Sequence, residues 1–330
     1  MLHIRDYMSE DKLFEALDSK IRRNILHILI NDGPKNLDQL ARHLGVTNGA
    51  LITHIRLLEQ VHLIKTEFVG AKRGLSKMCL INTNRIVIDL LPIEKKAEKS
   101  RETDIDIGLY GDYMVLPTCG LVTKDGPIGK FDEPRFFAYQ ERTKAALLWF
   151  GIGYVEYIVP NLLKEGEMLS EIQFVFEIAS EVPGFMEFYP SDIHFWLNDK
   201  CLGYWTIDGE KNDRRGLFTP DWWDRKLGQY GIIYILSLNN TGAYLNGYDL
   251  CKGTRNGKQI GGYTLRDFLI DSHSDIRFKI GVPDDTENRG GLSLFGKGFG
   301  DYNRGITCRM VYMSDADSRS SAKGNGSVQT

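Results

Sequence analysis

Cysteine is scarce in this sequence, and its spacing argues against a disulfide framework and against a zinc site. The five cysteines lie far apart, at Cys79, Cys119, Cys201, Cys251 and Cys308. An odd, scattered set without a Cys-x-x-Cys pair suits neither paired disulfides nor a tetrahedral metal site. We therefore expect all five to serve as small apolar side chains, and we expect neither a metal nor a cofactor.

Long apolar runs are missing as well. No stretch approaches the roughly 18 consecutive apolar residues that a membrane-spanning helix needs. The opening residues MLHIRDYMSE carry charges where a signal peptide has its apolar core. These absences predict a cytoplasmic protein without a membrane partner.

The first hundred residues lack tryptophan and are poor in glycine and tyrosine. Of the 34 glycines, 29 lie beyond residue 98, as do all five tryptophans and 14 of the 15 tyrosines. Residues 1–98 hold 15 Lys and Arg against 12 Asp and Glu, whereas the remainder holds 26 against 32. Because phosphate binding follows local cation density, we expect a polyanionic partner to contact the basic head alone. We predict two domains, 1–98 and 105–314, with a charged linker at 99–104 and a disordered tail at 315–330.

Residues 36–60 have the pattern of two short helices joined by a tight turn. Apolar residues of the first helix recur at helical spacing, at Leu37, Leu40, Ala41 and Leu44. Gly45 follows where a helix ends and the backbone takes a positive φ. Thr47 can cap a second helix whose buried stripe is formed by Leu51, Ile55 and Leu58. This spacing fits an ordinary helical hairpin as well, and only the next segment favours a helix-turn-helix.

Residues 61–82 form two apolar, strand-like runs on either side of a glycine-bracketed basic tip, Gly70-Ala71-Lys72-Arg73-Gly74. A hairpin after a recognition helix is a wing, which adds phosphate contacts to the base contacts of the helix. The residues that we expect to face DNA are Thr47, Asn48, Gly49, Ile52, Thr53, His54, Arg56, Lys72 and Arg73. His54 lies beside the buried stripe, so a phosphate contact and packing behind the helix both remain open.

In this order, LFEALDSKIRRNILHILI, LDQLARHLGVTNGALITHIRLLEQVHLIK and the wing resemble the ArsR-type winged-helix repressors. The resemblance is closest over residues 13–82 and extends to about residues 9–98. It implies a winged helix-turn-helix that binds double-stranded DNA as a homodimer and represses transcription. The family's metal sensors carry a Cys pair before the recognition helix, or Asp and His ligands on the last helix. Here those places read NLDQLAR and NTNRIVIDLL, so metal sensing is not expected.

An apolar stripe follows the wing, and we expect it to lie on a terminal helix with Ile86, Ile88, Leu90 and Leu91. In the resembled family the first and last helices form the dimer, which places two recognition helices one DNA turn apart. The alternative is that this stripe packs against the chain's own C-terminal domain.

Beyond residue 105 helical periodicity nearly vanishes, and short alternating runs predict strands. Residues 172–178 alternate as a strand with one face inward, formed by Ile172, Phe174, Phe176 and Ile178. Residues 192–207 read as a hairpin around Asn198. About ten strands over some 200 residues favour a β-sandwich of jelly-roll type. The predicted fold class is therefore α+β multidomain, a winged helix-turn-helix followed by an all-β, jelly-roll-like sandwich.

One connection in the β domain is unusually long. Residues 208–231, DGEKNDRRGLFTPDWWDRKLGQYG, concentrate aromatic, acidic and arginine side chains. Long irregular loops are commonly functional, and aromatic rings beside charged groups suit a sugar site. The expected ligand-binding residues are Trp196, Arg214, Arg215, Asp221, Trp222, Trp223 and Asp224. The alternative is that this Trp-rich loop caps the core or forms a dimer contact.

Three functions remain, in order of preference. The first is a DNA-binding repressor whose β domain senses a small polar ligand, with a carbohydrate as the favoured effector. The second is a regulator whose β domain serves only protein interaction or oligomerisation. The third is a DNA-tethered carbohydrate-active enzyme. No nucleophile motif or dinucleotide fingerprint is present, so we expect no catalytic residues and no enzymatic activity.

Overall fold

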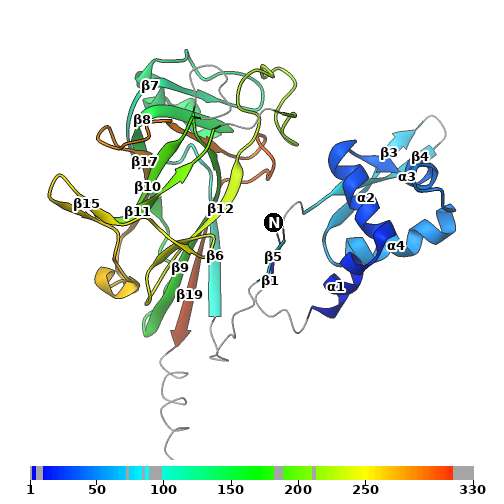
Figure 1. The fold of residues 1–330 in the computed structure, drawn as a ribbon, viewed down its shortest axis with the longest axis horizontal. Coiled ribbons are helices and arrows are strands. Elements are labelled where there is room, and N and C mark those ends of the chain that lie inside the picture. The colour runs from blue at the N-terminus through cyan, green and yellow to red at the C-terminus, as the bar shows by residue number, and fades with distance from the viewer. Residues whose placement is uncertain are drawn as a thin grey trace, which may run out of the picture. The chain divides into compact units, whose positions relative to one another are not determined.

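The computed structural model describes residues 2–4, 10–71, 74–83, 86–88, 99–181, 189–209 and 213–314 (Figure 1). The chain forms two compact units, Met1–Lys95 and Lys96–Thr330, and each is considered by itself. The predicted tail at 315–330 lies outside the described residues.

The N-terminal unit contains four helices and a small antiparallel sheet. The helices are α1 (Asp11–Asp18), α2 (Lys20–Asn31), α3 (Leu37–Leu44) and α4 (Asn48–Gln60). The sheet has the order β2-β4-β3, with β2 (Lys35–Asn36), β3 (Ile64–Ala71) and β4 (Gly74–Ile81). A shared core holds Leu13, Ile25, Leu40, Ile55 and Cys79. The predicted winged helix-turn-helix fold is confirmed.

The predicted terminal helix after the wing is wrong for the residues described there. Residues Ile86–Ile88 form strand β5, which pairs in parallel with β1 (Leu2–Ile4). The run Ile-Val-Ile is β-branched throughout, and β-branched side chains favour strands over helices. Leu90 and Leu91, the other half of the expected stripe, lie outside the described residues.

The C-terminal unit is built around one curled sheet of twelve strands. Its strands are β6 (Lys99–Ile105), β7 (Asp112–Val122), β8 (Leu147–Val159), β9 (Glu167–Ala179), β10 (Ser191–Leu197), β11 (Lys200–Ile207), β12 (Ile232–Asn239), β13 (Ala243–Leu245), β14 (Tyr248–Asp249), β17 (Ile276–Val282), β18 (Leu292–Phe295) and β19 (Ile306–Ser314). A separate hairpin pairs β15 (Gly253–Arg255) with β16 (Lys258–Ile260). Three short 3-10 helices, η2 (Pro134–Ala138), η3 (Gln140–Lys144) and η4 (Leu265–Phe268), complete the described part of the unit.

The pairing divides this sheet into two halves that face each other. One half runs β11-β10-β17-β8-β7, the other runs β6-β19-β9-β12-β13-β14, and β18 pairs with both β8 and β9. Aromatic side chains from the two halves meet between them, and the rings of Phe174 on β9 and Phe278 on β17 stack with centroids 4.1 Å apart. The arrangement is a β-sandwich-like fold, as predicted, and jelly-roll connectivity stays a prediction.

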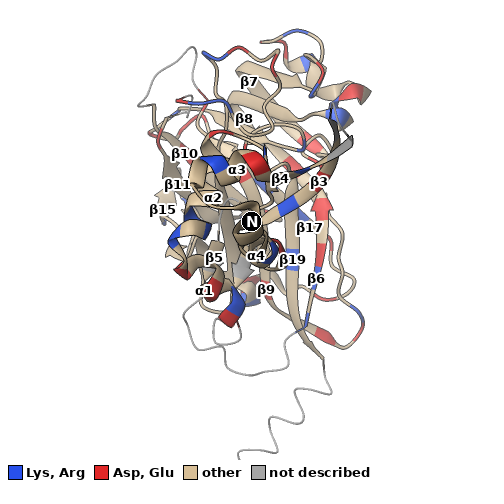
Figure 2. Cartoon of the chain, turned by 90° about the vertical axis from the view of Figure 1, so that its right-hand side faces the viewer, with Lys and Arg blue, Asp and Glu red and all other residues tan. Residues whose placement is uncertain are grey.

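Residues 99–104 are not a linker. They belong to β6, which pairs along its length with β19, from Lys99 opposite Tyr312 to Ile105 opposite Ile306. Its charged side chains belong to an edge strand, where charges protect the open edge from further pairing (Figure 2). Arg101, for example, donates to Glu167 at 2.8 Å and lies over the ring of Tyr312.

Two expectations about burial need correction. Four of the five cysteines are buried, but Cys251 is exposed. The strand at 172–178 was expected to bury one face, yet Gln173, Val175 and Glu177 on the other face are buried too. The reason is that β9 lies centrally, between β12 and β19, and that loop residues cover its second face near Glu177.

Candidate nucleic-acid interface and ligand pocket

Helix α3 has a defined beginning and end. Asn36 and Gln39 form a capping box, in which each side chain accepts the other's backbone N–H at 2.9 Å. Gly45 ends the helix at φ 65°, a conformation that glycine takes without steric cost. The turn into α4 is therefore set by the local sequence, as the spacing predicts.

Helix α4 is the expected recognition helix. Thr47 caps it, with the side-chain oxygen accepting the N–H of Ala50 at 3.3 Å. Leu51, Ile55 and Leu58 are buried in the core, which confirms the predicted stripe. The helix is thus held from behind and presents its other side to solvent.

The exposed side of α4 carries most of the residues that we expect to face DNA. The exposed residues among them are Thr47, Asn48, Gly49, Ile52, Thr53 and Arg56. Two of these are oriented by neighbours: Asn48 donates to Asp38 on α3 at 2.5 Å, and Thr53 donates to the carbonyl of Ala50 at 3.1 Å. The exposed face therefore combines hydrogen-bonding groups with the guanidinium group of Arg56, which suits base edges and phosphates.

His54 differs from these residues. It is only half-buried, and its Nδ1 lies 3.4 Å from Nη1 of Arg22 on α2. That contact places the ring toward the body of the domain and favours packing behind the helix over a phosphate contact.

The wing is formed by β3 and β4, which pair up to Ala71 opposite Gly74. Lys72 and Arg73, the expected phosphate contacts, lie outside the described residues. On the described part of β3, Phe68 and Val69 are exposed, and Lys65 lies on the solvent side.

In the C-terminal unit, the two arginines of the long loop hold the loop together. Arg214 donates to both carboxylate oxygens of Asp301, at 3.0 and 2.6 Å, and lies over the ring of Tyr230. This pairing with the carboxylate raises the pKa of Arg214. Arg215 donates to the carbonyl oxygens of Pro220 and Trp223. Both side chains are therefore occupied by structural contacts and are not placed as free ligand-binding groups.

The paired tryptophans of this loop divide into one core residue and one surface residue. Trp223 is buried against Trp149 and Phe299, and its Nε1 donates to the carbonyl of Gly228 at 3.0 Å. Trp222 is 40% exposed, and its Nε1 donates to the carbonyl of Lys124 at 2.7 Å. The expectation that both rings form an open stacking platform is wrong for Trp223.

The remaining expected ligand-binding residues, Asp221, Asp224 and Trp196, make different kinds of contact. Asp221 is exposed, and its carboxylate lies 3.9 Å from Arg215. Asp224 accepts the backbone N–H of Lys226 at 2.9 Å, which makes it a turn residue. Trp196 lies on β10 and stacks with His194 at 5.6 Å between centroids. Of the seven residues, Arg214, Asp221, Trp222 and Asp224 are exposed, but Arg214 is paired with Asp301 and Asp224 accepts within its own turn.

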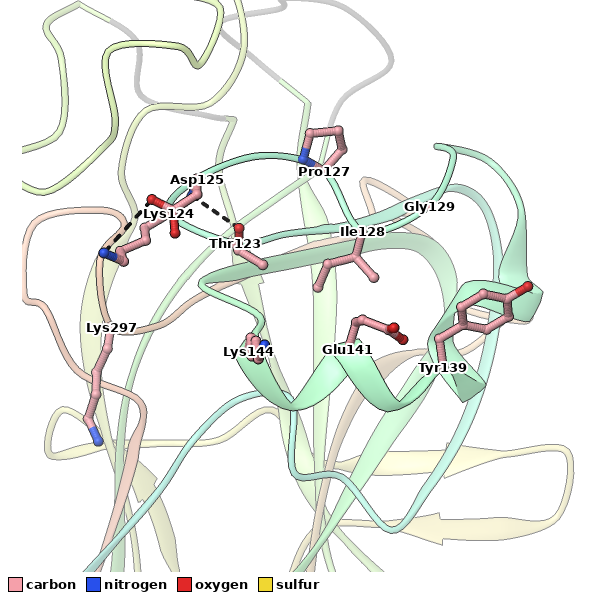
Figure 3. Close-up of a pocket in the computed structure, with 10 residues that line it drawn as sticks. All are labelled: Thr123, Lys124, Asp125, Pro127, Ile128, Gly129, Tyr139, Glu141, Lys144 and Lys297. Atoms are coloured by element: carbon pink, nitrogen blue, oxygen red, sulfur yellow. Dashed lines mark hydrogen bonds and ion pairs between the residues drawn. The ribbon is translucent and has the colours of Figure 1, made fainter.

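A pocket that sequence reasoning missed opens beside Trp222. Its volume is about 740 Å³, within the usual range of small-molecule sites. Figure 3 shows the turn at 123–127 on one side and η3 on the other, with Ile128 between them. The lining residues are Thr123, Lys124, Asp125, Pro127, Ile128, Gly129, Tyr139, Glu141, Lys144 and Lys297.

A buried glutamate, Glu177, holds two loops in place: the long loop that ends at Gly231 and the loop that contains Asp301 and Tyr302. The carboxylate of Glu177 on β9 accepts the backbone N–H groups of Gly231, Asp301 and Tyr302, at 2.9, 2.9 and 3.1 Å. Burial raises the pKa of Glu177 to about 8 and outweighs the opposite effect of these hydrogen bonds. Glu177 thus connects the core strand to the loops that carry Arg214 and Asp301.

Two classes of site receive no support within the described ranges. No helix there is long and apolar enough to cross a membrane. No three His, Cys, Asp or Glu side chains of the same residues gather where they could hold a metal ion.

Comparison with known proteins places the N-terminal unit. Residues 19–66 match the family described as "Bacterial regulatory protein, arsR family". An uncharacterized HTH-type transcriptional regulator of Methanocaldococcus jannaschii is 40% identical over 58 residues, which are 18% of this chain and 60% of that protein. The chain thus spans less than two thirds of the length of this curated relative.

Two solved structures are each similar to less than a quarter of the chain. An ArsR family transcriptional regulator is 26% identical over 24% of this chain and 75% of its own, with a TM-score of 0.20. A transcriptional regulator homologue from Pyrococcus horikoshii OT3 is 32% identical over 22% of this chain and 77% of its own, with a TM-score of 0.19.

Proposed function

We propose, from the premise that residues 19–66 form an ArsR-family helix-turn-helix domain, that this chain is a DNA-binding transcriptional regulator. The observation that carries the proposal is the exposed face of α4, which is capped at Thr47 and held by a buried stripe on its opposite side. A helix fixed in this way can enter the major groove without rearranging.

The contacts that we propose fall into two groups. Asn48, Thr53 and Arg56 face base edges, because they project from the exposed side of α4. The wing, with Lys72 and Arg73 in its sequence, supplies phosphate contacts. Figure 2 colours the ribbon blue at the Lys and Arg residues.

We further propose that the chain binds as a homodimer and acts as a repressor. Two-fold symmetry would place two copies of α4 on successive turns of a pseudo-palindromic operator. The described β1–β5 pair replaces the expected last helix, so the dimer contact need not be the one that the resemblance implies.

The β unit is, in this proposal, a non-enzymatic effector domain for a small polar ligand, with a sugar as the favoured class. The support is a pocket with several polar side chains, formed in part by the turn to which the exposed Trp222 bonds at the carbonyl of Lys124. Occupancy alters DNA binding only if the ligand prefers one of two arrangements of the regulator.

A second role for the β unit has one observation in its favour. Met114 and Leu116 on β7 and Ile158 on β8 are exposed on the outer side of the same half of the sheet. Several exposed apolar side chains on one face of a sheet are typical of protein contacts. A protein-interaction module is therefore the alternative.

The test of DNA binding begins with selection of duplexes from a random pool by the full chain. Anisotropy then measures the affinity of the selected duplex for the wild type, for Arg56→Ala and for the control Arg225→Ala. Both arginines are exposed, but Arg225 belongs to the β unit. We expect Arg56→Ala to weaken binding by about tenfold or more and the control to leave it unchanged. If no sequence is enriched, or if both variants behave alike, α4 is not the recognition helix.

A further inference from the structure

We propose that the pocket beside Trp222 binds a neutral saccharide, an inference that rests on the proposed effector role of the β unit. The pocket lies between the turn at 123–127 and η3, and it is distinct from the arginine-rich part of the long loop (Figure 3). Four properties of its lining carry the inference: its rigidity, its aromatic ring, its balance of charge and its size.

The first wall of the pocket is a closed turn. The hydroxyl of Thr123 accepts the backbone N–H groups of Asp125 and Gly126, at 3.0 and 3.1 Å. The backbone N–H of Thr123 in turn donates to the carbonyl of Gly126 at 2.8 Å. Trp222 fixes the same turn from outside through its bond to the carbonyl of Lys124. The turn is therefore held before any ligand arrives, which lowers the entropic cost of binding.

The second wall is η3, and it is also anchored. Arg142, on its inner side, donates to the carbonyl oxygens of Gly108 and Tyr110, at 2.6 and 2.7 Å. Gly129 lies against the ring of Phe136 with φ 68°, where an added Cβ would be 2.1 Å from that ring. Only glycine fits there, so the backbone of this lining residue packs directly against the ring of Phe136.

An aromatic ring, that of Tyr139, belongs to the lining. Tyr139 is 46% exposed and packs edge-on against Phe136, with centroids 4.8 Å apart. Trp222 lies outside the lining, but it is also exposed and is fixed to the turn by its bond to the carbonyl of Lys124. Rings that are both exposed and fixed provide the flat apolar surface on which the C–H face of a sugar ring stacks.

The charges of the lining nearly balance, and this favours a neutral ligand. The lining carries the ammonium groups of Lys124, Lys144 and Lys297 and the carboxylates of Asp125 and Glu141. Asp106 lies outside the lining, but it pairs with Lys297 at 2.8 Å and offsets the third ammonium group. A site for a phosphate or an acid would show surplus positive charge. Alternating donors and acceptors instead match hydroxyl groups, each of which both donates and accepts.

Within the described part of the chain, Glu141 and Lys144 form no ion pair, and both are exposed on η3. They are three residues apart, and both line the pocket (Figure 3). Their groups are therefore available to a ligand without breaking an existing contact, unlike those of Arg214 and Arg215.

The experiment is calorimetric titration of the full chain with glucose, galactose, mannose, N-acetylglucosamine, maltose and cellobiose, and with glucose 6-phosphate for comparison. The variants are Glu141→Gln, Lys144→Gln and Tyr139→Ala, and the matched control is Lys226→Gln, an exposed lysine outside the pocket. We expect at least one neutral sugar to bind, and each pocket variant to weaken it by about tenfold while the control does not.

Three results would overturn the inference. The first is that no sugar of the panel binds, the second is that glucose 6-phosphate binds more tightly than every neutral sugar, and the third is that a sugar binds the pocket variants as tightly as it binds the wild type.

Titration of the same samples with the selected duplex separates this inference from the proposed function. If the duplex binds but no sugar does, the saccharide site is refuted and the proposed DNA-binding role stands. If a sugar binds but does not change the affinity for the duplex, the saccharide site stands and the proposed effector role is refuted.

Discussion

The buried carboxyl of Glu177 makes the stability of the β unit depend on pH in a direction that can be measured. Burial raises its pKa from the ordinary 4.5 to about 8. The folded chain therefore keeps a proton on Glu177 that the unfolded chain releases near pH 4.5. The stabilisation is fully present below that pH and is lost as the pH rises through about 8.

The size of the loss of stability follows from the difference between the pKa of Glu177 in the folded chain and in the unfolded chain. One unit of pKa corresponds to about 1.4 kcal/mol, so the full loss between pH 4.5 and pH 8 is on the order of 5 kcal/mol. Between pH 6 and pH 8, where few other side chains titrate, the expected loss is about 2 kcal/mol. The pKa of about 8 already includes the opposing effect of the three backbone N–H groups, which donate to the carboxylate and stabilise its ionised form.

The assay is urea unfolding of the full chain at several pH values, followed by tryptophan fluorescence. All five tryptophans lie beyond residue 98, so the signal reports the β unit alone. Glu177→Gln has nearly the same shape and no titrating proton, and the control Glu165→Gln changes an exposed glutamate. We expect the variant to be less stable near pH 5 and to lose the wild-type slope between pH 6 and pH 8. Parallel curves for the wild type and Glu177→Gln would show that the carboxyl is ionised in the folded chain and that the reasoning is wrong.

Three further predictions concern the N-terminal unit. Changing Lys72 and Arg73 together to Ala should weaken binding to all duplexes and reduce the salt dependence by about two counterions; unchanged affinity and slope would remove the wing from the interface. Thr47→Ala should destabilise the N-terminal unit by about 1 kcal/mol through loss of the α4 cap, measured by thermal unfolding, with no loss if the cap is not formed. Added Zn²⁺ or a chelator should leave operator affinity unchanged, and a change of about tenfold, roughly 1.4 kcal/mol of coupling, would contradict that expectation.

Local signals in the sequence predicted the helix-turn-helix well. The positive φ at Gly45, the cap at Thr47 and the stripe from Leu51 to Leu58 each depend on neighbours within a few residues. Such features follow from backbone geometry and helical spacing, which a single sequence contains.

Features that depend on distant partners could not be predicted in the same way. Residues 99–104 read as a charged linker because their partner strand, β19, lies two hundred residues later. The run Ile86–Ile88 was assigned to a helix because its strand partner is β1, at the other end of the unit. Register between such segments is set by tertiary pairing and not by composition.

The candidate ligand site shows the same limit. Trp222 and Trp223 are adjacent tryptophans, and the neighbouring sequence does not indicate which of the two rings is buried in the core. Arg214 looked free because its partner, Asp301, is far away in the sequence. The pocket combines residues from the turn at 123–127, from η3 and from Lys297, so no single stretch indicates it. A glutamate inside an apolar strand, at Glu177, was the one local sign of the buried network.

The most direct test of the account is hydrogen exchange of the full chain with and without the selected duplex. The central claim is that DNA is contacted through α4 and the wing and not through the β unit. We predict slower exchange at the first turns of α4, around Asn48 to Thr53, and in β3 and β4 when the duplex is bound. Protection confined to residues beyond 98, with α4 unchanged, would contradict the claim.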